Sequence, residues 1–230
     1  MSNTVLVIGQ SGSGKSTSLR SLDPKTTFII NVLDKPLPFR GFKKNYIPIR
    51  SVMDDNGNKT GGYEGNYFAS DNWDNIVKTI SIVNHKRQDI TTIVIDDWQY
   101  ILAYEFMRRV GEKGFDKFSE LASHGWQTIN ACLATRPTLT CFILAHSDVD
   151  NMGRSKCKTI GKMLDEKITI EGLFTTVLHS RVVDGNYLFQ TQFDNEYLAK
   201  SPIGMFEELL IPNDLQMVKE AIENYYNGEE

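Results

Sequence analysis

A glycine-rich stretch near the start of the chain, GQSGSGKST at residues 9–17, combines residue types that suit phosphate binding. Its glycines let consecutive backbone N–H groups turn inward around a polyphosphate without Cβ clashes. The stretch follows the apolar run TVLVI, and its pattern Gly-x-x-x-x-Gly-Lys-Ser fits a P-loop. We therefore predict that Lys15 contacts the β- and γ-phosphates of a nucleotide and that Ser16 is a ligand of Mg²⁺. The predicted nucleotide-binding residues are Gly9, Gln10, Ser11, Gly12, Ser13, Gly14, Lys15, Ser16 and Thr17.

Two adjacent carboxylates end another apolar run, TTIVIDD at residues 91–97. A P-loop enzyme needs a second anchor for its metal ion, and Asp96 suits this role in the manner of a Walker B aspartate. Asp97 either polarises the attacking water or caps the helical segment WQYILAYEF that follows it. The predicted cofactors are ATP and Mg²⁺, with Ser16 and Asp96 as the metal ligands.

The apolar run LTCFILAH at residues 139–146 ends in a polar group, His146, followed by Ser147 and Asp148. A polar side chain in this position can sense the γ-phosphate, which makes His146 a candidate catalytic residue; a structural histidine at a strand end is the alternative. The chain has neither the Asn-Lys-x-Asp motif of GTPases nor the LSGGQ signature of ABC proteins.

These candidate residues need elements that bring them together. Short β-branched runs predict strands at 4–9, 26–32, 91–97, 139–146 and 173–179, and near-continuous apolar strands are typical of a parallel sheet covered on both faces. Helical patterns follow the glycine loop at 16–22 and recur at 72–86 and 118–134. The alternation predicts an α/β fold, a P-loop NTPase with a mostly parallel sheet and helices on both faces. Residues 181–193 predict a hairpin that turns at Asp184-Gly185 or Gly185-Asn186.

One P-loop domain spanning residues 1–230 accounts for the whole chain, whose apolar fraction of 40% suffices for a core. Residues 51–72 are rich in Gly, Asn and Asp and predict an exposed insertion or hairpin, while 213–230 predict a terminal helix capped by Asn213 or Asp214. Three cysteines without CxxC spacing, no signal peptide and no long apolar stretch predict a cytoplasmic protein without a membrane partner. With a net charge of −4, any contact with nucleic acid requires a local basic patch.

The order of these parts resembles the RecA-type core, and more specifically the phage-encoded RecA-like ATP-binding proteins of the Sak type. The stretches that carry the resemblance are GQSGSGKST, TIVIDDWQYI, FMRRVGEKGFDKF, KTIGKMLDEKITIEGLF and AKSPIGMFEE. Such proteins act in single-strand annealing and recombination. The resemblance therefore implies single-stranded DNA as a partner, a single-strand DNA-binding protein as a possible second partner, and the host cytoplasm as the location. It leaves homo-oligomer formation open.

In the RecA-type core, the loops after the Walker B strand and after the sensor strand line the DNA path. The residues that the resemblance assigns to DNA binding are Arg108, Arg109, Lys113, Lys117, Arg154, Lys156 and Lys158. Both basic stretches are alternatively ordinary solvated loops. Lys162 or Lys167 corresponds to the basic residues that reach a neighbouring subunit's γ-phosphate. The catalytic glutamate after the second strand is missing, so either Asp34 or Asp97 replaces it or hydrolysis is weak.

The predicted function is therefore Mg²⁺-dependent binding and hydrolysis of ATP by a RecA-like protein that binds single-stranded DNA and assists annealing or recombination. Two alternatives remain open. One is a P-loop kinase that phosphorylates a small acceptor, and the other is a regulatory ATPase that acts on a protein partner. Stimulation of ATP hydrolysis by DNA distinguishes the first function from both.

Overall fold

The computed structural model describes residues 3–161 and 163–228. Its centre is a nine-stranded mixed sheet with the strand order β11-β10-β9-β1-β7-β6-β2-β5, from which β8 branches by pairing with β7. Strands β9, β1, β7, β6, β2 and β5 run parallel, whereas β10 and β11 extend one edge in antiparallel fashion. The strands are β1 (Asn3–Gly9), β2 (Thr27–Asn31), β5 (Tyr67–Ala69), β6 (Thr92–Asp96), β7 (Thr140–Val149), β8 (Ser155–Cys157), β9 (Thr176–Val183), β10 (Asn186–Gln190) and β11 (Leu210–Pro212).

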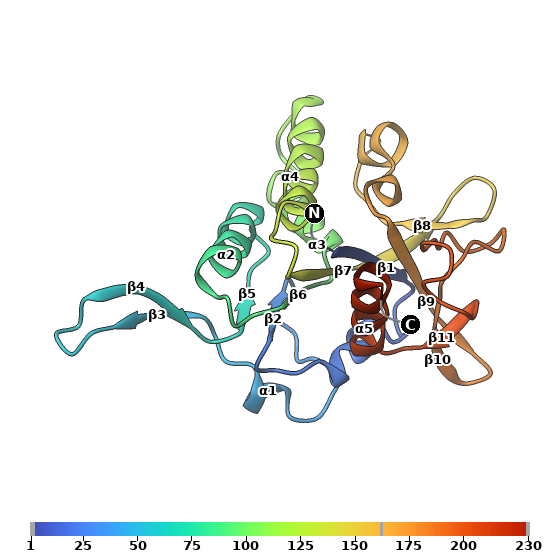
Figure 1. Ribbon diagram of the computed structural model, residues 1–230. Helices are drawn as coiled ribbons and strands as arrows, with labels where there is room; N and C mark the ends of the chain where they lie inside the picture. The colour runs from blue at the N-terminus through green and yellow to red at the C-terminus, as the bar shows by residue number, and fades with distance from the viewer. Residues whose placement is uncertain (1–2, 162, 229–230) are drawn as a thin grey trace.

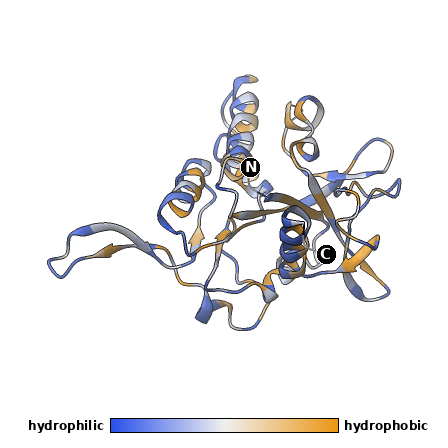
Figure 2. Cartoon of the chain, viewed as in Figure 1, coloured by the Kyte–Doolittle hydropathy of each residue, from blue (hydrophilic) through white to orange (hydrophobic). Residues whose placement is uncertain are grey.

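Helices cover both faces of this sheet (Figure 1). One face carries α2 (Trp73–Lys86), α3 (Gln99–Arg108), α4 (Asp116–Leu133), the π-helix η2 (Met163–Ile168) and the 3-10 helix η3 (Ile170–Leu173). The other face carries the 3-10 helix η1 (Ser16–Ser21), α1 (Phe42–Asn45) and α5 (Leu215–Asn227). Figure 2 shows the apolar residues running along the strands. The predicted α/β fold with a mostly parallel sheet covered on both faces is confirmed.

Alternate side chains of each strand enter different cores because successive residues point to opposite faces. Leu6 and Ile8 of β1 join the core beneath α2–α4, whereas Val5 and Val7 join the core beneath α5. All four are essentially inaccessible to solvent. Burial on both faces is the reason that the strand sequences are apolar without a polar alternation.

Two of the predicted elements differ clearly in extent or type. Strand β9 begins at Thr176, later than predicted, because residues 170–173 form η3. Helix η1 is a six-residue 3-10 helix in place of the predicted helix over 16–22. Three serines and a threonine are weak helix formers, and Pro24 lies shortly beyond its end.

The predicted exposed insertion forms a two-stranded hairpin, β3 (Arg50–Met53) and β4 (Lys59–Glu64), which extends away from the sheet (Figure 1). Its strands pair only with each other. The prediction was too long at its carboxyl end, since Tyr67–Ala69 forms β5 and pairs with β2 inside the main sheet.

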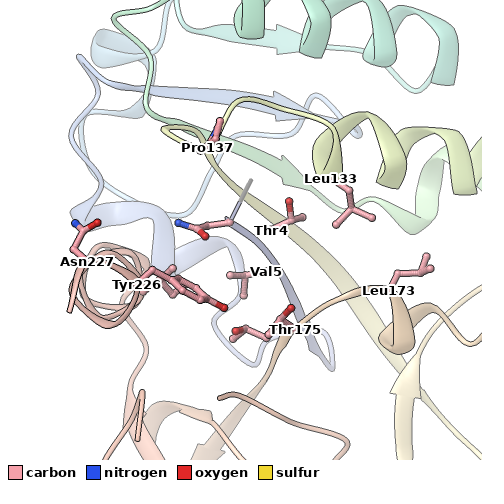
Figure 3. Close-up of a pocket in the computed structure, with 11 residues that line it drawn as sticks. Thr4, Val5, Leu133, Pro137, Leu173, Thr175, Tyr226 and Asn227 are labelled. Carbon is pink, nitrogen blue, oxygen red and sulfur yellow. The ribbon is translucent and has the colours of Figure 1, made fainter. Parts of the chain in front are cut away.

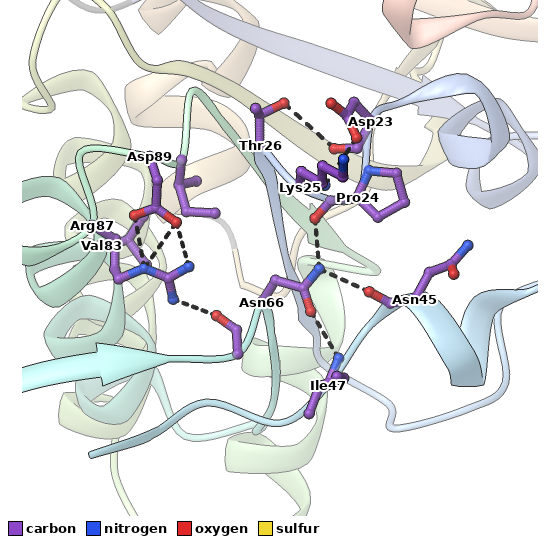
Figure 4. A network of polar contacts seen from close by, with 12 residues as sticks. Asp23, Pro24, Lys25, Thr26, Asn45, Ile47, Asn66, Val83, Arg87 and Asp89 are labelled. Carbon is purple, nitrogen blue, oxygen red and sulfur yellow. Dashed lines mark hydrogen bonds and ion pairs between the residues drawn. The ribbon is translucent and has the colours of Figure 1, made fainter. Parts of the chain in front are cut away.

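Asn66 fixes the base of this hairpin to the body (Figure 4). The side chain accepts a hydrogen bond from the N–H of Ile47 at 2.7 Å and donates to the carbonyls of Pro24 at 2.7 Å and Asn45 at 3.0 Å. Beside it, Arg87 donates to the carbonyl of Gly65. The hairpin therefore leaves the body through a connection in which side chains satisfy the backbone groups that no strand pairs.

Two further sequence alternatives are resolved. The β9–β10 hairpin turns at Asp184-Gly185, where both residues have positive φ and Asn186 pairs with Val183. Helix α5 is capped by Asp214, whose carboxylate accepts hydrogen bonds from the N–H groups of Gln216 and Met217. The cysteines at 132, 141 and 157 are all buried. Within the described ranges, the helices lack the length and apolar character that a membrane crossing needs.

Candidate nucleotide site

The parallel order of the strands gathers the predicted chemical groups at one edge of the sheet. Strand β1 lies between β7 and β9, so its carboxyl end at Gly9 is level with His146 on one side and Ser180 on the other. Likewise, Asn31 at the end of β2 is level with Asp96 at the end of β6. Ligands of open α/β sheets bind in the crevice outside the carboxyl ends of the strands, which is where the loop 9–17 begins.

Glycines shape the loop for two separate reasons. Gly12 and Gly14 have φ values of 79° and 96°, which side-chain-bearing residues rarely adopt. Gly9 is needed for close packing, because a Cβ there would lie 2.5 Å from the carbonyl oxygen of Ser180. At Gly14 a Cβ would also lie 2.7 Å from the ring of Tyr187. Glycine is thus required at these positions by backbone conformation and by the close approach of β9 and β10.

Two residues that the sequence did not reveal hold the loop from the carboxyl-terminal part of the chain. Ser180 donates a hydrogen bond from its hydroxyl to the carbonyl of Ser13 at 2.7 Å, and Asn213 donates to that hydroxyl at 3.2 Å. Both side chains are buried. Neither belongs to a recognisable motif, so only the fold brings them to the loop.

Lys15 folds back over its own loop. Its ammonium group donates hydrogen bonds to the carbonyls of Gly9 at 2.8 Å and Gln10 at 2.9 Å. Burial lowers the pKa of Lys15 to about 8, although the negative charges of Asp97 and Asp96 oppose this shift. The cation is therefore held at the loop, where phosphate oxygens would be stronger acceptors than neutral carbonyls.

Ser16 and Asp96 meet although 80 residues separate them in the chain. The Ser16 hydroxyl lies 2.8 and 3.0 Å from the two carboxylate oxygens of Asp96. Burial, reinforced by the charge of Asp97, raises the pKa of Asp96 to about 6. A fully buried carboxylate facing a hydroxyl fits Mg²⁺, a hard cation that proteins often hold through one or two carboxylates plus phosphates and water. Among the side chains that the structure describes, which exclude those of residues 165 and 166, no cluster of three acidic, histidine or cysteine groups would suit a metal bound by protein alone.

Asp97 points into the same site rather than capping α3. Its carboxylate forms an ion pair with Lys35 and lies 3.3 Å from Nε2 of His146. Helix α3 begins without a side-chain cap, so the capping alternative is wrong. Burial raises the pKa of Asp97, but the hydrogen bonds from His146 and Lys35 outweigh burial and leave it below its usual value. Asp97 is thus an ionised carboxylate beside the loop.

A pocket of about 250 Å³ lies among these groups. Its walls are formed by Ser11, Gly12, Gly14, Lys15, Ser16, Thr17, Lys35, Pro38, Asp97, His146 and Tyr187. The structure therefore brings together three of the four predicted catalytic residues. Asp34, the fourth, is exposed outside these walls and accepts a hydrogen bond from the Tyr67 hydroxyl at 2.8 Å. Lys35 and Tyr187 line the pocket without having been predicted.

Helix η1, which follows the loop, adds little to anion binding. A long α-helix starting at the loop would contribute its dipole, but a six-residue 3-10 helix contributes little. The donors that remain are the loop N–H groups and the two lysines at 15 and 35. Binding of a polyphosphate here would depend mainly on those local donors.

The first basic stretch is mostly engaged within the protein. Arg109 lies 3.1, 2.8 and 2.7 Å from carboxylate oxygens of Glu105, Glu112 and Glu120, respectively. Lys117 donates to the carbonyl of Glu112 at 2.7 Å and lies over the rings of Phe106 and Phe118. Both residues therefore stabilise the connection between α3 and α4 and are not presented to a phosphate backbone.

The other predicted DNA-binding residues lie nearer to solvent. Arg108 pairs with Asp71 at 2.6 Å and Lys113 is exposed in the connection between α3 and α4. Arg154 pairs with Asp150 at 2.8 Å, and Lys156 belongs to β8, which is followed by the exposed Lys158. Of the two candidates for a neighbouring subunit, Lys167 is exposed on η2. Lys162 lies outside the described residues.

A larger cavity, of about 650 Å³, opens at the amino ends of the parallel strands, opposite the loop (Figure 3). It is lined by residues of β1, the carboxyl ends of α4 and α5, and the start of β9, including Val5, Leu133 and Tyr226. None of its described lining residues is charged. It does not suit a polyphosphate, so the smaller pocket at the loop is the candidate nucleotide site.

No protein-family model and no curated protein matches this chain, and we therefore infer its function from the residues and geometry of the site.

Proposed function

We propose that the chain is a RecA-like P-loop protein that binds ATP with Mg²⁺ and hydrolyses it. The observation that carries the proposal is the contact between the Ser16 hydroxyl and the Asp96 carboxylate at 2.8 Å. It joins the loop after β1 to the end of β6, as a shared metal ion requires. The pocket of about 250 Å³ beside this contact supports the proposal with two lysines and a second carboxylate.

The side chains of the site have separate roles in this reaction. The loop N–H groups and Lys15 bind and orient the phosphates, and Lys15 stabilises charge that develops on them. Bound Mg²⁺ would neutralise phosphate charge and orient the oxygens, with Ser16 and Asp96 as its protein ligands. Asp97 accepts a hydrogen bond from the attacking water and takes up its proton. His146 holds Asp97 in place and borders the pocket that would receive the terminal phosphate.

We further propose that hydrolysis is coupled to single-stranded DNA in annealing or recombination, as in the phage proteins that the sequence resembles. Lys113 and Lys158 are the exposed basic residues that support this step most directly. Phe115, which is 87% exposed, could stack on a base. Lys113 and Phe115 lie on the connection between α3 and α4, and Lys158 follows β8.

A regulatory ATPase acting on a protein partner is the second candidate. It is favoured by the end of α3 and the connection to α4, where Met107, Val110 and Phe115 are exposed while Arg109 is enclosed by carboxylates. Exposed apolar side chains close together in the chain suit a protein contact better than a phosphate backbone.

ATP hydrolysis measured with and without single-stranded DNA tests both steps. We expect Mg²⁺-dependent hydrolysis that DNA accelerates, and its loss in Lys15→Ala, because the phosphates then lack their buried cation. Circular dichroism checks that the variant is folded. Wild-type turnover by a folded Lys15→Ala protein would refute the P-loop assignment. Hydrolysis that ignores DNA but responds to a protein partner would favour the second candidate.

A further inference from the structure

Lys35 is a second cation in the pocket, and no part of the P-loop motif accounts for it. It lies in the turn after β2 and forms an ion pair with Asp97, whose side chain is only 2% exposed. The Lys35 side chain is 45% exposed, so it enters the pocket from the solvent side. It borders the same 250 Å³ space as Lys15 and Ser16.

The turn that carries Lys35 is held in place by its neighbours. The side-chain amide of Asn31 donates to the carbonyl of Lys35 at 2.7 Å, and the N–H of Val32 donates to the carbonyl of Asp96 at 3.2 Å. Asp34 has a φ of 51° and is tied outward by the Tyr67 hydroxyl. Because Asp34 is turned outward and Lys35 inward, the end of β2 contributes a cation to the pocket.

From its position, the Lys35 ammonium group can move from the Asp97 carboxylate to a phosphate group bound in the pocket. A lysine ammonium sits on a flexible four-carbon stem, so a backbone fixed in place still lets the charge move several ångströms. Asp97 offers it a single negative charge, whereas a terminal phosphate spreads more charge over three oxygens. If Lys35 moves, Asp97 retains His146 as a partner at 3.3 Å.

We propose that Lys35 binds the terminal phosphate of a nucleoside triphosphate and thereby lets the site distinguish a triphosphate from a diphosphate. The inference rests on the proposed function, because it concerns the same nucleotide site. With a diphosphate, which has no third phosphate, Lys35 stays paired with Asp97. With a triphosphate it moves to the phosphate oxygens and leaves the Asp97 carboxylate open to a water molecule.

Isothermal titration calorimetry in the presence of Mg²⁺ tests the inference, with ADP and the non-hydrolysable analogue AMP-PNP as probes. The variant Lys35→Met keeps the length of the side chain and removes its charge. We expect it to weaken AMP-PNP binding roughly 10- to 100-fold, the range for loss of a charge-assisted contact, while ADP affinity changes by less than about threefold. Lys35→Arg should retain most of the preference for the triphosphate.

Two further variants separate the effects that Lys35→Met combines. Lys43→Met removes an exposed lysine from α1, outside the pocket, and should leave both affinities unchanged. The double variant Lys35→Met/Asp97→Asn also removes the carboxylate that Lys35→Met leaves without its cation. We expect it to bind AMP-PNP as weakly as Lys35→Met does, because the phosphate contact is still missing.

Some contrary results would overturn the inference about Lys35, and another would refute the proposed function. Recovery of AMP-PNP affinity in the double variant would show that Lys35 only neutralises Asp97, and the inference would be overturned. Equal losses for ADP and AMP-PNP in Lys35→Met, or no loss for either, would overturn it as well while leaving the proposed function intact. Failure of the wild-type chain to bind either nucleotide would instead refute the proposed function.

Discussion

Asp96 and Asp97 are neighbours in the chain, yet their side chains meet different partners. Asp96 faces the Ser16 hydroxyl, whereas Asp97 faces Lys35 and His146. A positive φ of 65° at Asp97 turns the backbone sharply, which brings two consecutive carboxylates into one site. Such a conformation is costly for an aspartate and is found where the surrounding structure enforces it.

Substitution of Asp96 should therefore affect hydrolysis and nucleotide binding differently from substitution of Asp97. Asp96→Ala removes a proposed ligand of Mg²⁺, so we expect Mg²⁺-dependent hydrolysis to disappear while some nucleotide still binds through the loop N–H groups. Asp97→Asn keeps the shape but cannot accept a proton, and we expect hydrolysis to slow by about 10²- to 10⁴-fold. Hydrolysis rates and nucleotide affinities of both variants test this. An unchanged rate for Asp97→Asn would exclude it as the base.

His179 makes stability depend on pH. It is buried within β9, 2.6 Å from the Ser155 hydroxyl, and burial together with the charges of Arg181 and Lys15 lowers its pKa to about 4. The unfolded chain takes up this proton near pH 6.5, before the native protein does, so stability falls as the pH drops from 6.5 towards 4.

We expect this histidine alone to remove about 2 kcal/mol of stability between pH 7 and pH 5. Urea unfolding of the wild type and of His179→Asn at several pH values measures it, because the asparagine variant lacks the titrating group. The variant should lose about 2 kcal/mol less than the wild type over this range. Parallel pH curves for the two proteins would show that His179 is not responsible.

At the scale of elements, the hairpin β3–β4 depends on its base rather than on a core. A two-stranded hairpin by itself is marginally stable in water. Most residues of β3 and β4 are exposed or half-buried, whereas Asn66 at the base is buried and makes three hydrogen bonds to backbone groups. The hydrogen bonds of Asn66 at this connection should therefore determine whether the hairpin is ordered.

Asn66→Ala should lower the free energy of unfolding by about 2–3 kcal/mol, since three part-buried hydrogen bonds between its side chain and backbone groups are lost. Asn58→Ala, at the exposed tip of the same hairpin, is the matched control and should change it by less than about 0.5 kcal/mol. Chemical denaturation measures both values. Equal effects of the two substitutions would contradict a special role for the base.

The sequence predicted well those strands whose continuous apolar residues indicate burial on both faces of the sheet. Apolar runs predicted β1, β2, β6 and β7 within a few residues because strands buried on both faces leave little choice of side chain. The length of η1 and the start of β5 were missed because the residues of these segments alone do not determine them. Pairing with β2 makes Tyr67–Ala69 a strand.

In the candidate site, too, some residues were predictable from sequence motifs and others were not. The glycine motif marked the loop at the edge of the sheet, and the end of an apolar run marked Asp96, which lies beside Ser16. Lys35, Ser180, Tyr187 and Asn213 carry no motif, and they reach the site only through the order of the strands and the turns that follow them. Asp34 was placed in the site by its position after β2, but the turn directs it outward.

At the scale of the whole molecule, an acidic chain can bind DNA only through a local excess of positive charge. If single-stranded DNA follows the exposed basic residues, log K should fall with log salt by about 0.7 for each phosphate contacted, or near 3 for four or five contacts. Lys113→Glu/Lys158→Glu should weaken binding for every sequence, because phosphate contacts carry no sequence information.

Fluorescence anisotropy with labelled oligonucleotides at several salt concentrations measures both quantities. Arg109→Glu serves as a contrast, since it places a fourth carboxylate among Glu105, Glu112 and Glu120 and should lower the melting temperature instead. Affinity and salt slope that remain unchanged after reversal of Lys113 and Lys158 would leave these residues as solvated surface.

Ser180 and Asn213 hold the loop through hydrogen bonds. These contacts determine when, during translation, the nucleotide site can form. Residues 9–17 leave the ribosome before Ser180, which bonds the Ser13 carbonyl from 167 residues further along the chain, and before Asn213, which bonds Ser180. Domains generally fold as units when their chain is available. A nascent chain should therefore gain its proposed affinity for nucleotide only after Ser180 and Asn213 have emerged, and a chain that stalls before Ser180 should carry the motif without the binding.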